Sequence, residues 1–225
     1  MNWSAIFSSS VGKKFIMAVT GVFLIVFLVV HVGLNACIFA NDNGEMFNKA
    51  AHFMGSHWLI RLTEIVLFVG IIAHAVQAYV LEAQNRSKRK AGYQVALGER
   101  GSKWYSRSMG LLGTFLLLFL IMHLAHFWVP ARITGVPNET ADGHHDMYSL
   151  MLTTFSNPVV VVLYVIGCIS LAYHLIHGFQ SAFRTLGVYN NRYIALIDWA
   201  GKAFSILVPL IFAAMPLSIY FGWLK

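Results

Sequence analysis

The chain has 225 residues, of which 58% are hydrophobic and only 11% charged, and its formal net charge is +7. A soluble domain usually carries about 25% charged residues, so this composition excludes an ordinary soluble protein. The wealth of hydrophobic residues also excludes an intrinsically disordered chain. Two cysteines, Cys37 and Cys168, are too few for a disulfide framework or a four-thiolate metal site. Ten histidines are the unusual feature of the composition.

Five long apolar stretches predict an all-α, polytopic membrane protein with five transmembrane helices. We expect these helices at approximately 15–39, 58–82, 108–129, 157–182 and 200–223. A helix needs about 20 apolar residues to cross the hydrocarbon core, and each stretch is long enough. The first stretch exceeds the about 7–15 apolar residues of a signal peptide and is followed by no small-residue cleavage site. We therefore expect a single transmembrane domain over residues 1–225.

Basic residues gather on one side of the expected helices. The N-terminus and the connectors at 82–107 and 183–202 together carry 12 of the 16 lysines and arginines. Lysine and arginine accumulate in cytoplasmic loops, which predicts a cytoplasmic N-terminus and an outside C-terminus. The positive charge thus indicates orientation in the membrane and requires no nucleic-acid partner. The basic face could also meet anionic lipid or an acidic partner protein.

Six of the ten histidines lie within expected spans, and the first four spans each carry at least one. These residues are His31, His74, His123, His126, His174 and His177. An ionisable side chain in a span is a functional-site hypothesis by default. A single histidine could be a packing hydrogen bond between helices. Four helices that repeat the feature favour a shared site instead.

Depth in the membrane sorts four of these histidines into two pairs. At 1.5 Å per residue from the cytoplasmic border, His31 and His123 lie roughly 25 Å deep, on the first and third spans. His74 and His177 lie roughly 10–12 Å deep, on the second and fourth spans. Two imidazoles at one depth on different helices of a bundle suit the axial positions of a haem iron. The first four spans are therefore predicted to form a haem-binding bundle with an outer and an inner haem.

Neighbouring histidines leave the ligand choice open. His126 and His174 each lie three residues from a preferred ligand and are alternative ligands of the outer and inner haem. Three glycines lie ten residues before preferred ligands, roughly 15 Å along the helix and so level with the other haem. They are Gly21, Gly113 and Gly167. Glycine there would leave room for the edge of a macrocycle, which favours the preferred ligands.

Glu64 is the single acidic residue well inside an expected span. Because di-iron bundles need several carboxylates, a di-metal site is excluded. Glu64 lies roughly 27 Å from the cytoplasmic border, near the level of the outer haem. It is a candidate proton-handling group at a quinone pocket. The alternative is an ion pair at the membrane boundary, with Arg61 or His57 as its partner.

Short segments around these histidines follow a recognisable order. They are Ser-Ser-Val-Gly-Lys-Lys at 9–14, Val-Val-His-Val at His31, Ile-Ala-His-Ala at His74, Met-His-Leu at His123, and Ile-His-Gly-Phe at His177 with Arg184 seven residues on. In this order and spacing the chain resembles the di-haem cytochrome b membrane-anchor subunits of succinate dehydrogenase and fumarate reductase, in their single-anchor, five-helix form. The resemblance covers nearly the whole chain.

The resemblance implies two haem b groups as cofactors, with His74 and His177 on the inner haem and His31 and His123 on the outer one. It implies that a flavoprotein subunit with FAD and an iron–sulfur subunit dock on the cytoplasmic face of a bacterial inner membrane. Such a subunit transfers electrons in a respiratory chain without itself being the catalytic subunit, and it exchanges them with a quinone, usually menaquinone. Leu175 stands where some fumarate reductases of this family carry a glutamate, which argues against a transmembrane proton pathway of that type.

Two other functions fit parts of the pattern. The cytochrome b anchor of a hydrogenase or formate dehydrogenase would also place two haems in a helical bundle. A transporter without haem would use the histidines as proton relays or packing groups. A spectrum that shows reducible b-type haem would exclude the transporter, and the subunits that copurify would separate the two kinds of anchor.

Overall fold

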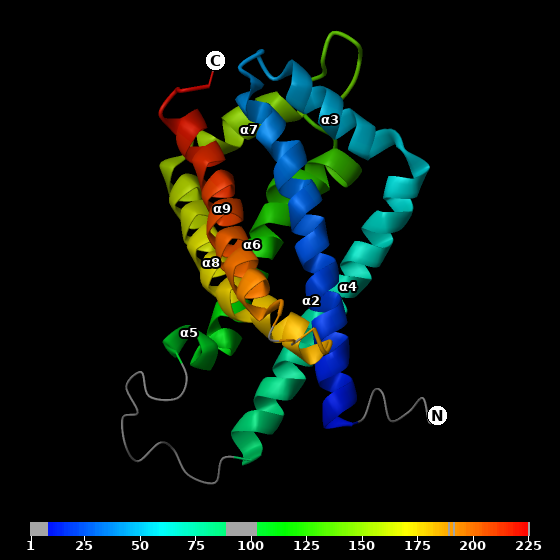
Figure 1. Cartoon of the computed structure of the whole chain (residues 1–225). Coiled ribbons are helices and arrows are strands. Elements are labelled where there is room, and N and C mark those ends of the chain that lie inside the picture. Colours follow the sequence, from blue (N-terminus) through cyan, green and yellow to red (C-terminus); the bar gives the residue numbers. More distant parts are fainter. Residues whose placement is uncertain (1–8, 89–102, 189, 191, 225) are drawn as a thin grey trace.

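Five long helices dominate the computed structural model, which describes residues 9–88, 103–188, 190 and 192–224. Within these residues, five helical spans are long and apolar enough to cross a membrane (Figure 1). They are Val11–Ala40, Trp58–Ser87, Met109–Thr134, Pro158–Thr185 and Ile194–Tyr220. The prediction of an all-α chain with five membrane-spanning helices is confirmed. Arg89, Lys90 and Arg100, which contribute to the expected basic side, lie outside the described residues.

The first two spans are formed by α2 (Ser10–Asn35), which continues into η1 (Ala36–Ala40), and by α4 (Trp58–Lys88). The Ser9 side chain caps α2 by accepting a hydrogen bond from the Gly12 N–H. Between these spans, α3 (Glu45–Ser56) lies across the end of the bundle at which α2 ends (Figure 1).

The third span is longer than the sequence predicts. It begins after the short α5 (Trp104–Arg107), runs through α6 (Met109–His123), and continues through the π-helical segments η2 (Leu124–Trp128) and η3 (Pro130–Thr134). The expected end at residue 129 followed the end of the apolar stretch, but the helix continues through Pro130, because proline is tolerated in the first turn of a helical segment. The helix therefore carries five further residues.

The last two spans are α8 (Pro158–Thr185) and α9 (Ile194–Tyr220), preceded by α7 (Met147–Phe155) at the end of the bundle that α3 covers (Figure 1). Asn157 caps α8 through the Val159 N–H, and Pro158 occupies the first turn, where its missing N–H costs nothing. α8 and α9 lie side by side along much of their length. Their close approach depends on Gly201, because a Cβ there would lie 2.7 Å from the Phe179 ring.

Two kinds of surface follow from this arrangement. A buried apolar cluster joins η1, α3, α7, α8 and α9 at one end of the bundle and contains Ile38, Phe47, Tyr148, Met151, Phe155, Val161, Tyr164, Met215 and Ile219. Elsewhere many large apolar side chains of the spans face outward, such as Ile65, Val69 and Ile72 of α4. In a soluble protein such a surface would be an aggregation hazard, whereas a bilayer solvates it.

Candidate cofactor-binding site

The outer histidine pair is brought together by α2 and α6. The ring centroids of His31 and His123 lie 5.9 Å apart, with their planes at 89°. A metal ion between two imidazoles, with metal–nitrogen bonds of about 2 Å, would separate the ring centres by about 6 Å. The Nδ1 atom of His123 is buried and has no hydrogen-bond partner among the described residues. The spacing would suit a haem iron held between His31 and His123, and the unsatisfied Nδ1 shows that His123 is not occupied by a packing hydrogen bond at that atom.

Phenylalanine rings surround the outer pair. Phe27 stacks on His31 with ring centroids 5.0 Å apart. The ring centroid of Phe212 lies 5.5 Å from that of the same imidazole. Phe119 stacks on His123 with ring centroids 5.9 Å apart, and the ring centroids of Phe127 and His123 lie 5.5 Å apart. An apolar shell of this kind keeps water from a metal centre and lowers the local dielectric constant, both of which influence a reduction potential.

The inner histidine pair joins α4 and α8. The ring centroids of His74 and His174 lie 6.2 Å apart, with their planes at 62°. The Nδ1 atom of His174 is buried without a hydrogen-bond partner in the described part of the chain, whereas Nδ1 of His74 lies 3.1 Å from the Thr20 hydroxyl oxygen. The spacing again fits a metal between two imidazoles.

The histidine opposite His74 is thus the alternative of the sequence analysis rather than the preferred ligand. His177 lies three residues further along α8, where it lines a small cavity of about 170 Å³ together with Gln180, Ser181, Arg184 and Thr185. Counting residues gives a depth but not a direction around the helix, and the two histidines differ by roughly 60° around its axis. The geometry therefore favours His174 as the partner of His74.

His126 is engaged elsewhere. Its Nδ1 atom lies 3.1 Å from the Tyr164 hydroxyl oxygen, and the two rings stack with centroids 5.8 Å apart and planes at 10°. A histidine satisfied in this way serves helix packing between the third span and α8. Because His126 is engaged by Tyr164, the structure favours His123 over His126 as the ligand opposite His31.

The three glycines differ in what surrounds them. A Cβ on Gly21 would lie 3.6 Å from Cε1 of His74, so this glycine does lie beside the inner pair. A Cβ on Gly113 would meet no atom within 4 Å. A Cβ on Gly167 would lie 2.4 Å from the Phe119 ring, so Gly167 allows α6 to pack closely on α8. The space beside Gly167 is thus filled by a side chain, contrary to the expected room for a macrocycle.

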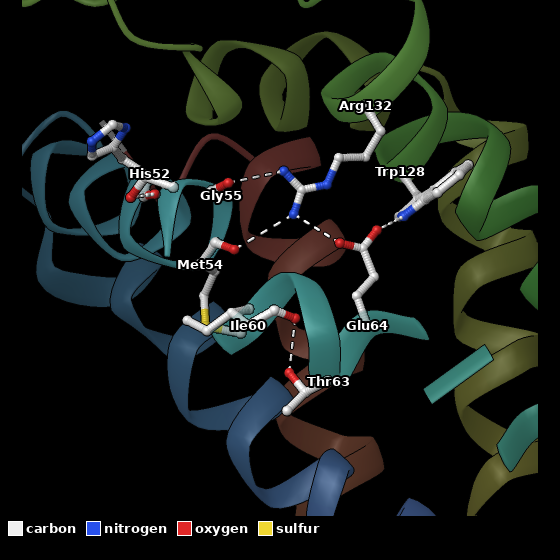
Figure 2. Close-up of polar contacts among 9 residues, drawn as sticks. His52, Met54, Gly55, Ile60, Thr63, Glu64, Trp128 and Arg132 are labelled. Carbon is white, nitrogen blue, oxygen red and sulfur yellow. Dashed lines mark hydrogen bonds and ion pairs between the residues drawn. The ribbon is translucent and has the colours of Figure 1, made fainter. Parts of the chain in front are cut away.

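Glu64 of α4 takes part in an ion pair at the outer end of the third span (Figure 2). Its Oε2 atom accepts a hydrogen bond from Nη2 of Arg132 at 3.1 Å, and its Oε1 atom accepts one from the Trp128 indole N–H. The side chains of Arg132 and Glu64 are only 16% and 18% exposed. Arg132 also donates to the backbone carbonyls of Gly55 and Met54, at 3.3 and 3.5 Å. These contacts tie the end of α3 to the third span.

Sequence reasoning named Arg61 and His57 as partners of Glu64 and missed Arg132. It placed Arg132 in a loop because the third span was expected to end at residue 129. The signal lay in the spacing of Trp128 and Arg132, which are four residues apart and so share a face if the helix continues past Pro130.

A cavity of about 280 Å³ adjoins the Glu64 carboxylate and is lined by Arg61, Glu64, Ile65, Phe68 and Trp128. The rings of Phe68 and Trp128 meet edge to face, with centroids 5.2 Å apart. Apolar and aromatic walls with a few polar groups are typical of small-molecule sites. The carboxylate could hold or release a proton at a polar oxygen of a ring bound there.

Comparison with known proteins gives one relative. Over 164 residues, 72% of this chain and 73% of the relative, the chain is 28% identical to the succinate dehydrogenase cytochrome b558 subunit of Bacillus subtilis. No family model and no solved structure matches the chain. The similarity to this subunit confirms the resemblance of the chain to the cytochrome b membrane-anchor subunits of succinate dehydrogenase and fumarate reductase.

Proposed function

We propose that the chain is the membrane-anchor cytochrome b subunit of a succinate:quinone or fumarate:quinone oxidoreductase. It passes electrons between a cytoplasmic iron–sulfur subunit and a quinone in the membrane, for which the resemblance implies menaquinone. The observation that carries the proposal is the arrangement of two histidine pairs, at 5.9 and 6.2 Å, within one bundle of membrane-spanning helices. The relative in Bacillus subtilis, named as a succinate dehydrogenase cytochrome b558 subunit, supports it.

Two haem b groups are the cofactors in this proposal. His31 and His123 hold the outer haem, and His74 holds the inner haem with His174, or with His177 as the resemblance implies. Bound haem supplies one-electron transfer. Thr20, which contacts His74, lies eleven residues before His31 on α2, so the two pairs are separated by roughly 16 Å along the helix. This separation places the two haems at two different depths in the bilayer.

Glu64 is the proposed proton-handling group of a quinone site near the outer pair. Reduction of a quinone consumes protons, and a carboxylate beside an aromatic cavity can supply or accept them. Arg132 forms an ion pair with this carboxylate and, with the Trp128 indole, fixes its direction. Arg61 lines the same cavity and is placed to contact an electronegative ring oxygen.

The catalytic partners are proposed to dock at the cytoplasmic end of the bundle. Basic residues predict that the N-terminal end of α2 and the segment around α5 face the cytoplasm, and both lie at the same end of the molecule (Figure 1). A basic surface there would attract an acidic partner and raise the rate of association. The flavoprotein and iron–sulfur subunits would carry the FAD and the iron–sulfur clusters.

The decisive experiment is an optical redox titration of the intact complex, combined with the masses of its subunits. We expect two b-type haems with separate midpoint potentials, in a complex that also contains a flavoprotein and an iron–sulfur subunit. Absence of reducible b-type haem would refute the proposal. A copurifying nickel or molybdenum subunit would assign the chain to a different quinone-linked complex.

The quinone site is tested by Glu64→Gln, which keeps the size of the side chain but removes its proton chemistry. We expect slower quinone turnover, by about 10²-fold or more if Glu64 is the proton donor, with unchanged haem content. Glu82→Gln is the matched control, because Glu82 also forms an ion pair on α4, with Arg86, but at the opposite end of the helix. Unchanged turnover in Glu64→Gln would leave Glu64 as a structural ion pair.

A further inference from the structure

The hydroxyl group of Thr20 occupies a special position between the first two spans. Its Oγ1 atom lies 3.1 Å from Nδ1 of His74. The same atom lies 2.8 Å from the backbone carbonyl oxygen of Ile16 and 3.1 Å from that of Met17. The Thr20 hydroxyl thus contacts two kinds of group: backbone carbonyl oxygens of its own helix, α2, and the imidazole of His74 on α4.

The donor in the Thr20–His74 contact depends on where the Thr20 proton lies. A threonine hydroxyl has one proton, and in a helix it is given to a carbonyl oxygen one turn earlier. The Thr20 hydroxyl has donor geometry toward two carbonyl oxygens, those of Ile16 and Met17, and we assign its proton to this pair. Toward His74 the hydroxyl then presents a lone pair. With the proton assigned in this way, His74 carries its own proton on Nδ1 and donates it to Thr20, which leaves the lone pair on Nε2.

This tautomer is the one that a metal-binding histidine needs when it binds through Nε2. A ligating histidine commonly donates its other N–H to an oxygen acceptor, which orients the ring and raises the basicity of the ligating nitrogen. Among the four paired histidines, His74 has such a hydroxyl acceptor. His123 and His174 have no partner at Nδ1 within the described residues, and Nδ1 of His31 lies 3.4 Å from a donor, Nδ2 of Asn35.

We infer that Thr20 is a positioning residue that fixes the tautomer of His74 and lowers the reduction potential of the inner haem. The inference rests on the proposed function, since it requires His74 to be a haem ligand. A more basic ligand stabilises ferric iron over ferrous iron, so the hydrogen bond to Thr20 favours the oxidised haem. Removal of the hydroxyl is expected to raise the midpoint potential of the inner haem.

The test is a redox titration of the intact complex with Thr20→Val, which replaces the hydroxyl by a methyl group of similar size. We expect both haems to be retained, with the midpoint potential of the inner haem shifted upward and that of the outer haem unchanged. His74→Ala identifies the inner haem in the titration, because the component that it removes is the one bound there. Thr20→Ser retains the hydroxyl and should restore the original potential.

Thr114→Val is the matched control. Thr114 also donates to a carbonyl one turn earlier, that of Gly110, but its side chain contacts Tyr79 and no histidine. We expect both midpoint potentials to be unchanged in this variant. A shift of the inner haem's midpoint potential in Thr114→Val equal to that in Thr20→Val would show a general response to losing a threonine hydroxyl and would overturn the inference.

The outcomes separate this inference from the proposed function. A wild-type complex without b-type haem would refute the proposed function itself. A wild-type complex with two haems, and a Thr20→Val variant with the same two potentials, would refute only the role of Thr20. If Thr20→Val loses the inner haem while Thr20→Ser keeps it, the hydroxyl is needed to orient His74, which supports the inference. Loss of that haem in both variants would indicate packing alone and contradict it.

Discussion

The outer pair, His31 and His123, lies among phenylalanine rings, whereas the inner pair has a hydroxyl group beside His74. The difference shows that two sites with the same ligand type can be adjusted by separate means. An apolar shell acts through the dielectric constant and the exclusion of water, while a hydrogen bond acts on the ligand itself. Two haems held in this way would differ in potential even with identical axial ligands.

The largest effect expected at the outer pair is loss of its haem. Either His31→Ala or His123→Ala removes an axial ligand, so the haem content per chain should fall by about half, with the inner haem retained. The pyridine haemochrome assay measures the content, and a redox titration shows which component remains. Retention of both haems in His123→Ala would instead favour His126 as the ligand.

The inner pair can be tested by the same kind of substitution. Here two histidines, His174 and His177, are candidates for the position opposite His74. The ring geometry predicts that His174→Ala loses the inner haem and that His177→Ala keeps it, because His174 faces His74 at 6.2 Å. The measurement is the haem content of the two variants side by side. Loss of the inner haem in His177→Ala alone would support the ligand implied by the family resemblance.

A smaller effect is expected where packing alone is changed. Gly167→Ala places a Cβ at 2.4 Å from the Phe119 ring, so overpacking should destabilise the bundle by about 1–3 kcal/mol. Because Phe119 stacks on His123, the absorption of the outer haem should shift while that of the inner haem does not. Thermal loss of the haem spectrum measures the stability of the complex.

Gly113→Ala is the control for this substitution, since a Cβ there meets no atom within 4 Å. We expect the stability of the complex to be unchanged. A weakened inner haem in Gly113→Ala would mean that the macrocycle uses this space, as the position of the glycine along its helix first predicted.

The smallest effect is expected for Tyr164→Phe, which removes the hydroxyl partner of His126. The loss of one hydrogen bond should cost about 0.5–1.5 kcal/mol in stability, and both haems should remain. Thermal unfolding and haem content measure the two quantities. A missing outer haem would show that the Tyr164–His126 contact is part of the outer site rather than of helix packing.

The spans and the levels of the histidines could be predicted from the sequence because both depend on distance along a helix. An apolar run has a length, and the rise per residue converts it into depth. The choice between His174 and His177 depends on rotation about the helix axis and on where α4 lies, and no count of residues supplies either. Tertiary packing supplies them, and the ring distance between His74 and His174 favours His174.

Arg132 was missed for a related reason. The expected boundary at residue 129 followed the end of the apolar run, which places Arg132 in the connector. The third span continues in wider π-helical turns, and the extra residues bring the guanidinium of Arg132 to Glu64. The acidic residue was found from the sequence because a carboxylate in a span is rare, whereas its partner lay beyond the expected boundary.

The packing of α9 along α8 has a consequence for biosynthesis. Every histidine of both pairs precedes residue 178, so all four are translated before Ile194, where α9 begins. The helix that contacts α8 along much of its length therefore leaves the ribosome after all four histidines. A nascent chain that stops after α8 would hold all four paired histidines while α8 still lacks its contact with α9, so stable haem insertion should wait until α9 has been made.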